Sequence, residues 1–304
     1  MTREEILAKI DEKYENLGEN PDTYLKGLLQ AKPINYWDYI QVDTLLSLQK
    51  PRTDFEDEEI FIMYHQVTEL VLKLMIHELK QITSKDLAEE ILADKVNRLN
   101  RYTEMLMTSF DVMRYGMDYD DYNTFRSTLA PASGFQSAQF RFLEIYCTPV
   151  ENLINSKGKE RLPEIPTVED LFDQVYWKDA GHNRKTGKKS LTLKAFEDKY
   201  LNDFIELAEA MKGNTLAEKF LKIDNPSDAL INGLRDMDYL YNVKWPMIHL
   251  NTAQHYLNKK GEEKAATGGS NWQKYLHPKY QQRKFFPFLW TEKEILNWAE
   301  SEKF

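Results

Sequence analysis

The stretch "FIMYHQVTELVLKLMIHEL", residues 61–79, decides the fold class. Its apolar residues recur at helical spacing, and Phe61, His65 and Leu72 fall on one stripe. Acidic residues precede it, as the helix dipole favours at an N-terminus. One long helix is therefore predicted over residues 56–82. It carries a histidine near the centre of a run that otherwise resembles core.

Helical periodicity dominates the rest of the chain. It predicts helices over 2–16, 36–49, 86–115, 191–223 and 226–258, with shorter ones between 122 and 147 and near the C-terminus. Thr2 and Glu5 form a capping-box pattern. Residues 156–190 are rich in Lys, Gly, Pro and Asn, which indicates an excursion from the core. No alternation is long enough for a sheet. The expected fold is all-α, a single-domain helical bundle.

Composition narrows the class of protein. The chain has 304 residues, 29% charged and 42% hydrophobic, which are globular values. A net charge of −9 argues against a general nucleic-acid binder. The charged N-terminus lacks a signal-peptide core, and no run is long enough to span a membrane, so a cytoplasmic protein is expected. Cys147 is the only cysteine, which excludes intrachain disulfides and cysteine-based zinc sites.

Two histidines on predicted helices are candidates for chemistry. His65 and Glu69 are four residues apart and could share a metal, but two ligands are too few and His77 lies three turns away. His249 and His255 point to nearly opposite faces of their helix, so only one can readily face inward. A single inward histidine suits a haem axial ligand better than zinc. The commoner alternative for each is an ordinary core or surface histidine.

Three further segments suggest ligand contacts. Arg126 lies one turn from Tyr122 and could bind a carboxylate, although most helical arginines are simply solvated. "APASGFQSAQFR" (130–141) follows with small residues that leave room against the backbone. "ATGGSNW" (266–272) could surround a carboxylate or phosphate with backbone N–H groups, or be a plain turn. It is not a phosphate-binding P-loop because the lysine is missing.

In their order, five segments resemble the tryptophan 2,3-dioxygenase family. They are "YWDYIQVDTLLSLQKP" (36–51), the stretch 61–79, "YNTFRSTLAPASGFQSAQFR" (122–141), "WPMIH…TGGS" (245–270) and "FPFLW" (286–290). The chain departs from the family's pattern after His249, where it reads "LNTAQHYLNKK", and before Thr267, where "GEEK" lengthens the loop and Ala266 replaces the usual glycine. Residues 150–200 also differ from the family's segment.

The resemblance implies a role for each matching residue. His249 would be the proximal ligand of a haem b that is ferrous in the active form. His65 would be the catalytic distal histidine facing the indole. Arg126, with Tyr122 beside it, would receive the substrate carboxylate, and Thr267 would meet the ammonium group beside a haem propionate. The other implied substrate-binding residues are Phe61 at the indole, Ser133 and Gly134 near oxygen, Tyr36, Tyr39 and Ile40 from a neighbouring subunit, and Leu129.

The implied activity is cleavage of the indole 2,3 bond of L-tryptophan with O2, giving N-formylkynurenine in tryptophan catabolism. The implied assembly is a homotetramer in which an N-terminal arm, residues 1–50, completes a neighbour's site. Residues 51–304 would form the haem-binding catalytic domain, with no nucleic-acid or membrane partner. Two alternatives remain: a related haem oxygenase acting on another indole without ring cleavage, and a haem-free helical interaction protein.

Overall fold

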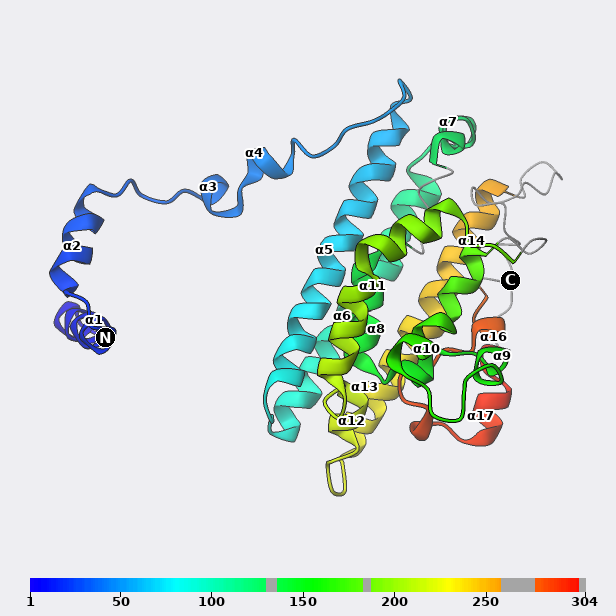
Figure 1. Ribbon diagram of the computed structural model, residues 1–304. Helices are drawn as coiled ribbons and strands as arrows, with labels where there is room; N and C mark the ends of the chain where they lie inside the picture. The colour runs from blue at the N-terminus through cyan, green and yellow to red at the C-terminus, as the bar shows by residue number, and fades with distance from the viewer. Residues whose placement is uncertain (130–135, 183–186, 258–276, 301–304) are drawn as a thin grey trace. The chain divides into compact units, whose positions relative to one another are not determined.

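The structure is a computed structural model that describes residues 1–129, 136–182, 187–257 and 277–300 (Figure 1). It divides into two compact units, Met1–Lys50 and Pro51–Phe304. Within the described residues every regular element is a helix, apart from two isolated β-bridges, which confirms the all-α class. In this part of the chain no helix is long and apolar enough to cross a membrane.

The first unit contains four short helices that bury no residue of their own. They are α1 (Arg3–Asn16), α2 (Pro21–Gln30), α3 (Tyr36–Ile40) and α4 (Val42–Leu45). The capping box at α1 is present, with Glu5 N–H donating to Thr2 at 3.2 Å. The helix predicted over 36–49 is interrupted at Gln41, whose φ of 54° lies in the left-handed region, and it ends at Leu45.

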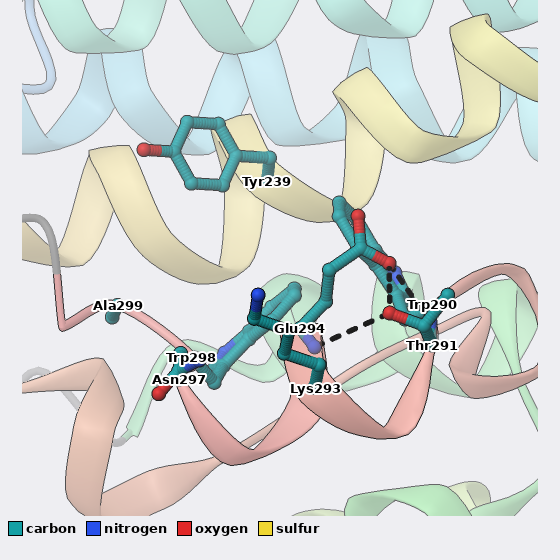
Figure 2. Close-up of a pocket in the computed structure, with 8 residues that line it drawn as sticks. All are labelled: Tyr239, Trp290, Thr291, Lys293, Glu294, Asn297, Trp298 and Ala299. Carbon is teal, nitrogen blue, oxygen red and sulfur yellow. Dashed lines mark hydrogen bonds between the residues drawn. The ribbon is translucent and has the colours of Figure 1, made fainter.

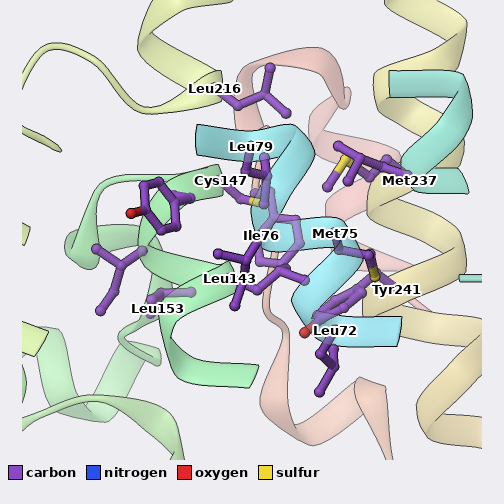
Figure 3. Close-up of a cluster of buried hydrophobic side chains, with 14 of the residues drawn as sticks. Leu72, Met75, Ile76, Leu79, Leu143, Cys147, Leu153, Leu216, Met237 and Tyr241 are labelled. Carbon is purple, nitrogen blue, oxygen red and sulfur yellow. The ribbon is translucent and has the colours of Figure 1, made fainter. Parts of the chain in front are cut away.

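Long helices form the second unit. They are α5 (Asp57–Ser84), α6 (Glu89–Tyr115), α8 (Ala138–Cys147), α11 (Leu191–Met211), α13 (Asp228–Tyr239) and α14 (Trp245–Leu257). The predicted helix over 56–82 is thus confirmed as α5, which packs against both α6 and α8. Figure 3 shows the core between these elements, where Leu72, Met75 and Leu79 of α5 meet Leu143 of α8 and Met237 of α13. Helix α5 thereby anchors the bundle and presents His65 near one end.

Short elements connect and cover the bundle. They are α7 (Tyr119–Phe125), η1 (Arg126–Leu129), η3 (Val150–Leu153), α9 (Ser156–Lys159), α10 (Val168–Asp173), η4 (Tyr176–Gly181), α12 (Leu216–Phe220), α16 (Pro278–Gln281), η6 (Pro287–Leu289) and α17 (Glu292–Leu296). The helix predicted over 191–223 is divided, because Gly213 has a φ of 75° and Thr215 caps a new helix.

Residues 156–190 differ from the expected excursion. Leu171, Phe172, Tyr176 and Trp177 are buried in the main hydrophobic cluster. Lys, Gly and Pro interrupt the segment into short turns, yet its apolar side chains still face the bundle. The composition therefore predicted the breaks between short elements, but it did not predict that the apolar side chains of this segment are buried.

Tyr176 also belongs to a buried polar network. Its hydroxyl donates to Glu144 Oε1 at 2.6 Å and accepts from Arg141 Nη1 at 2.6 Å and from Arg283. Both arginines also bond the Glu144 carboxylate, at 2.8 and 3.0 Å. Burial, the largest effect, raises the pKa of Tyr176, so its phenol remains a donor at neutral pH. The network joins α8, η4 and the segment after α16.

We expect Tyr176→Phe to lower the free energy of unfolding by about 1–3 kcal/mol, because a buried carboxylate and two guanidinium groups each lose a partner. Urea denaturation followed by circular dichroism measures this. Tyr115→Phe is the matched control, since Tyr115 is exposed and its change should stay within about 0.5 kcal/mol. Equal stability of the two variants would contradict the importance of the network.

Candidate functional site

His249 is positioned by an irregular helix. Helices α13 and α14 are joined by a π-helical turn, η5 (Leu240–Lys244), closed by the Trp245 N–H donating to the Leu240 carbonyl. Pro246 follows at once and has no N–H, and its ring would clash with the carbonyl four residues earlier in an α-helix. The wider π turn accommodates it. The extra residue rotates all later side chains by about 100°, which sets the direction of His249.

An aromatic series links His249 to His65. The His249 ring stacks on Phe110 of α6 with centroids 5.6 Å apart. Phe110 lies 5.5 Å from Tyr64, and Tyr64 lies 5.4 Å from His65 in an edge-on arrangement. Helices α5, α6 and α14 therefore bring the two histidines, 184 positions apart in the sequence, into one region.

Both imidazoles are held neutral. Desolvation, the larger effect, and then the nearby His65 lower the pKa of His249 to about 4. Desolvation also lowers the pKa of His65, against smaller raising effects of the Phe61 carbonyl and Glu69. The electrostatic effect of His65 on His249 shows that the rings lie close enough to interact.

Neither imidazole is sealed inside the core. Each keeps much accessible surface, yet protein atoms surround each closely enough to desolvate it. On α5, His65 shares its side with Phe61 and the fully buried Leu72. The accessible part of each ring is available to a ligand.

The tautomer of His65 follows from one hydrogen bond. Its Nδ1 lies 2.7 Å from the Phe61 carbonyl oxygen, which can only accept. Nδ1 therefore carries the proton, and in the neutral ring Nε2 presents a lone pair. The Phe61 ring packs on the same imidazole at 4.1 Å. The local fold thus places a hydrogen-bond acceptor, His65 Nε2, beside the aromatic ring of Phe61.

Tyr122 lies next to the Phe61 ring, and Arg126 lies near Tyr122. Tyr122 lies 6.3 Å from Phe61 and 4.5 Å from Tyr256 between ring centroids. Desolvation raises the pKa of the Tyr122 hydroxyl, and the opposing effect of Arg126 shows that the cation is nearby. Arg126 donates to Asn123 at 3.5 Å, and Asn123 donates to the Tyr256 carbonyl at 3.3 Å. The Arg126 guanidinium therefore lies near the aromatic side chain of Tyr122, and the hydrogen bond of Asn123 connects this part of the chain to α14.

Glu69 has a structural partner. Gln139 at the start of α8 donates to the Glu69 backbone carbonyl at 2.7 Å and to its carboxylate at 2.9 Å. In the described part of the chain, no three His, Cys, Asp or Glu side chains are placed to hold a metal ion. The His65–Glu69 pair is consequently not part of a conventional metal site among those residues. A cofactor whose metal needs one protein ligand remains compatible.

Several predicted site residues are not among those that the structure brings together. Leu129 ends η1, partly buried beyond Arg126. Ser133, Gly134 and Thr267 lie outside the described residues, as does the "ATGGSNW" loop. The neighbour-completing residues Tyr36, Tyr39 and Ile40 belong to the first unit, where all three are exposed. Their predicted roles stay predictions.

Sequence reasoning missed Tyr64, Phe110 and Tyr256. Tyr256 donates its hydroxyl to the carbonyls of Met113, at 2.6 Å, and Met117, at 3.2 Å, near the end of α6. It lies two turns after His249 on the same helix face, a spacing that could have suggested it. Nothing in the sequence pairs Phe110 with His249, because their contact depends on how α6 crosses α14.

The cavity in Figure 2 is separate from this region. It has a volume of about 540 Å³ and is lined by Tyr239, Trp290, Thr291, Lys293, Glu294, Asn297, Trp298 and Ala299. None of the predicted site residues lines it. Convergence of desolvated titratable groups instead favours the two-histidine region as the candidate site.

Comparison with known proteins gives concordant results. Residues 27–198, more than half of the chain, match a family model described as tryptophan 2,3-dioxygenase. This match covers Phe61, His65 and Arg126, and ends before His249.

Individual relatives extend the similarity toward the C-terminus. A tryptophan 2,3-dioxygenase of Ruegeria sp. (strain TM1040) is 29% identical over 270 residues, covering 86% of this chain and 92% of that protein. One of Bacillus thuringiensis subsp. konkukian (strain 97-27) is 29% identical over 280 residues, covering 85% and 91%. A third, of Bradyrhizobium diazoefficiens, is 27% identical over 291 residues, covering 88% and 94%.

Proposed function

Because the chain belongs to the tryptophan 2,3-dioxygenase family, we propose that it cleaves the indole 2,3 bond of L-tryptophan with O2 to give N-formylkynurenine. It would act in the cytoplasm, in tryptophan catabolism through the kynurenine pathway. The observation that carries the proposal is the aromatic series that brings His65 of α5 and His249 of α14 into one region. One can bind iron, and the other can accept a hydrogen bond from the substrate.

The residues present fit a haem b held by His249. A neutral imidazole is the form that coordinates iron, and a pKa of about 4 keeps His249 neutral at physiological pH. Among the described residues neither ring nitrogen of His249 has a hydrogen-bond partner, and the ring keeps accessible surface. When bound, the haem would supply the ferrous iron at which O2 is activated. The protein's part is to bind, orient and desolvate the substrate.

His65 is proposed to orient the indole. Its Nδ1–H donates to the Phe61 carbonyl, so Nε2 can accept a hydrogen bond from the indole N–H. The Phe61 ring beside it supplies an apolar face for the flat substrate. Stacking on Phe61 would fix the plane of the indole ring, and the hydrogen bond to His65 would fix how the indole is turned within that plane. Leu129 is proposed as a further substrate-binding residue, as the family resemblance implies.

The two charged groups of tryptophan need separate partners. Arg126, with the Tyr122 hydroxyl nearby, is proposed to bind the carboxylate through charge-assisted hydrogen bonds. Thr267 is proposed to meet the ammonium group beside a haem propionate, and Ser133 and Gly134 to border the oxygen. These three assignments rest on the family resemblance. Together the contacts would hold the amino acid by both ends.

The proposed assembly is a homotetramer in which residues 1–50 complete a neighbour's site. The arm's helices bury no residue of their own. Tyr36 and Tyr39 are 73% and 75% exposed, which suits side chains that another surface covers. Tyrosine is well adapted to such a boundary because its ring is apolar and its hydroxyl polar.

The direct test of the reaction uses haem-loaded protein. After anaerobic reduction, L-tryptophan and O2 should produce the absorbance of N-formylkynurenine, and mass spectrometry should find the ring opened. An oxygenated product with an intact ring would support the related oxygenase instead. A protein that binds no haem and gives neither product would refute both proposals and favour the interaction protein.

His249→Ala should abolish stable haem binding, whereas His255→Ala should not. His255 lies on the same helix with its ring against Tyr256, 4.9 Å away edge-on, and so provides the matched control. The Soret absorbance per protein measures haem content after gel filtration. Equal loss in both variants would refute the assignment of His249.

Arg126→Ala should weaken L-tryptophan binding by well over tenfold, since losing one side of a buried charged pair costs about 2–5 kcal/mol. Tryptamine lacks the carboxylate and should be affected little. Substrate-induced changes in the haem spectrum measure both affinities. Unchanged L-tryptophan affinity would mean that another residue binds the carboxylate.

Mixed assemblies test the shared site. Subunits with Arg126→Ala, and subunits with Tyr36→Ala and Tyr39→Ala, should each be weakly active alone. When the two are co-expressed, some pockets draw both intact parts from different chains, so activity should partly return. Verified mixed tetramers without recovery would show that each chain completes its own site.

A further inference from the structure

Asn123 of α7 lies between the arginine proposed to bind the substrate carboxylate and the helix that carries His249. Its Nδ2 donates to the Tyr119 carbonyl at 2.9 Å and to the Tyr256 carbonyl at 3.3 Å. Its Oδ1 accepts a long hydrogen bond from Arg126 Nη1 at 3.5 Å. One amide side chain thus connects its own helix, α14 and the Arg126 guanidinium.

The orientation of this amide is fixed by its two carbonyl partners. A backbone carbonyl can only accept a hydrogen bond, so the amide nitrogen of Asn123 must face both of them. The amide oxygen then lies on the other side, toward Arg126. Asn123 therefore presents an acceptor to the guanidinium, and the amide cannot turn round without losing the hydrogen bonds to both carbonyls.

Tyr256 is the fixed end of this connection on α14. It is 2% exposed, and its hydroxyl donates to two backbone carbonyls near the end of α6. Its ring packs on Tyr122 with centroids 4.5 Å apart. It follows His249 by seven residues, two turns along the same face of the helix, or about 10 Å. The acceptor of Asn123 and the His249 imidazole are consequently held by one helix.

The sequence gives this connection added interest. Tyr256 belongs to "LNTAQHYLNKK" (250–260), where the chain departs from the family's pattern. The resemblance to the family assigns no role to Tyr256 or to Asn123. The contacts of these two residues are therefore observations of this structure and do not follow from the resemblance.

The plane of the Arg126 guanidinium decides how well it can bind a carboxylate. Two parallel N–H···O bonds form only when the guanidinium and the carboxylate are nearly coplanar. An arginine side chain has several rotatable bonds, and ordering them costs free energy when a ligand binds. An acceptor that already holds one guanidinium nitrogen reduces this cost.

We propose that Asn123 is a positioning residue that orients the Arg126 guanidinium toward the substrate carboxylate, with the Tyr256 carbonyl as its anchor on α14. Asn123 acts through Arg126 and need not touch the substrate. It thereby strengthens the preference for indoles that carry a side-chain carboxylate over indoles that lack one. The inference rests on the proposed function, because it requires Arg126 to bind the carboxylate of tryptophan.

Titration calorimetry on the haem-loaded, full-length protein under anaerobic conditions measures substrate affinity without turnover. Asn123→Leu nearly preserves the side-chain volume and removes the hydrogen bonds of the amide. It should weaken L-tryptophan binding by about threefold to tenfold, as expected for one lost hydrogen bond, and change tryptamine binding by less than about twofold. Tryptamine is the comparison because it has no carboxylate.

Thr124→Ala is the matched control. Thr124 is the next residue of α7, is exposed, and donates its hydroxyl to the Asp120 carbonyl one turn earlier. The substitution should change neither affinity. Unchanged L-tryptophan affinity in Asn123→Leu, or equal losses for tryptophan and tryptamine, would overturn the proposal.

A double-mutant cycle separates positioning from a general structural effect. In the Arg126→Ala protein, adding Asn123→Leu should weaken L-tryptophan binding no further, because Asn123 acts through Arg126. The same additional loss in both backgrounds would show that Asn123 acts independently of the arginine, and would overturn the proposal.

Circular dichroism and Soret absorbance establish that each variant is folded and contains haem. If Asn123→Leu does not fold, Asn123→Ala makes the same comparison with a smaller side chain. A parent protein without preference for L-tryptophan over tryptamine would contradict the proposed role of Arg126 and this inference with it. A parent that has the preference, and keeps it in the Asn123 variants, contradicts only the inference.

Discussion

Desolvation of two imidazoles between α5, α6 and α14 is the constraint on which the site depends. A protonated imidazole loses solvation in this enclosure, so both rings are neutral at physiological pH. A neutral imidazole has one ring nitrogen without a proton. This nitrogen can bind a metal ion or accept a hydrogen bond. The aromatic series through Phe110 and Tyr64 connects the two rings. One packing arrangement thus supplies both groups that the proposed function needs.

The direction of His249 depends on a second buried group. Asp238 accepts hydrogen bonds from the backbone N–H groups of Phe285 and Phe286, at 2.7 and 3.2 Å, and from the Trp290 indole at 2.8 Å. These bonds attach the end of α13 to the C-terminal segment just before the π turn. The helix is therefore anchored on one side of the irregularity, and the extra residue then sets where His249 points.

Much of this organisation was predictable from the sequence, and the reason is periodicity. The pattern over 56–82 identified α5 and put His65 on the side of Phe61 and Leu72. Ordered motifs identified the family, which the family match confirms. The π turn was not predicted, because a single proline inside a helical pattern indicates a break or a kink without specifying which. The burial of 168–177 was also missed, since composition reports turns and not which side chains face the core.

If the proposed haem binds, its coordination in the reduced protein tests the central claim most directly, because both His65 and His249 are neutral imidazoles in one region. Absorption and magnetic circular dichroism of the anaerobic ferrous protein report how many protein ligands the iron has. The account predicts five-coordinate, high-spin iron bound by one histidine, with His65 left to accept the indole N–H. A six-coordinate, low-spin spectrum of iron bound by two histidines would contradict it.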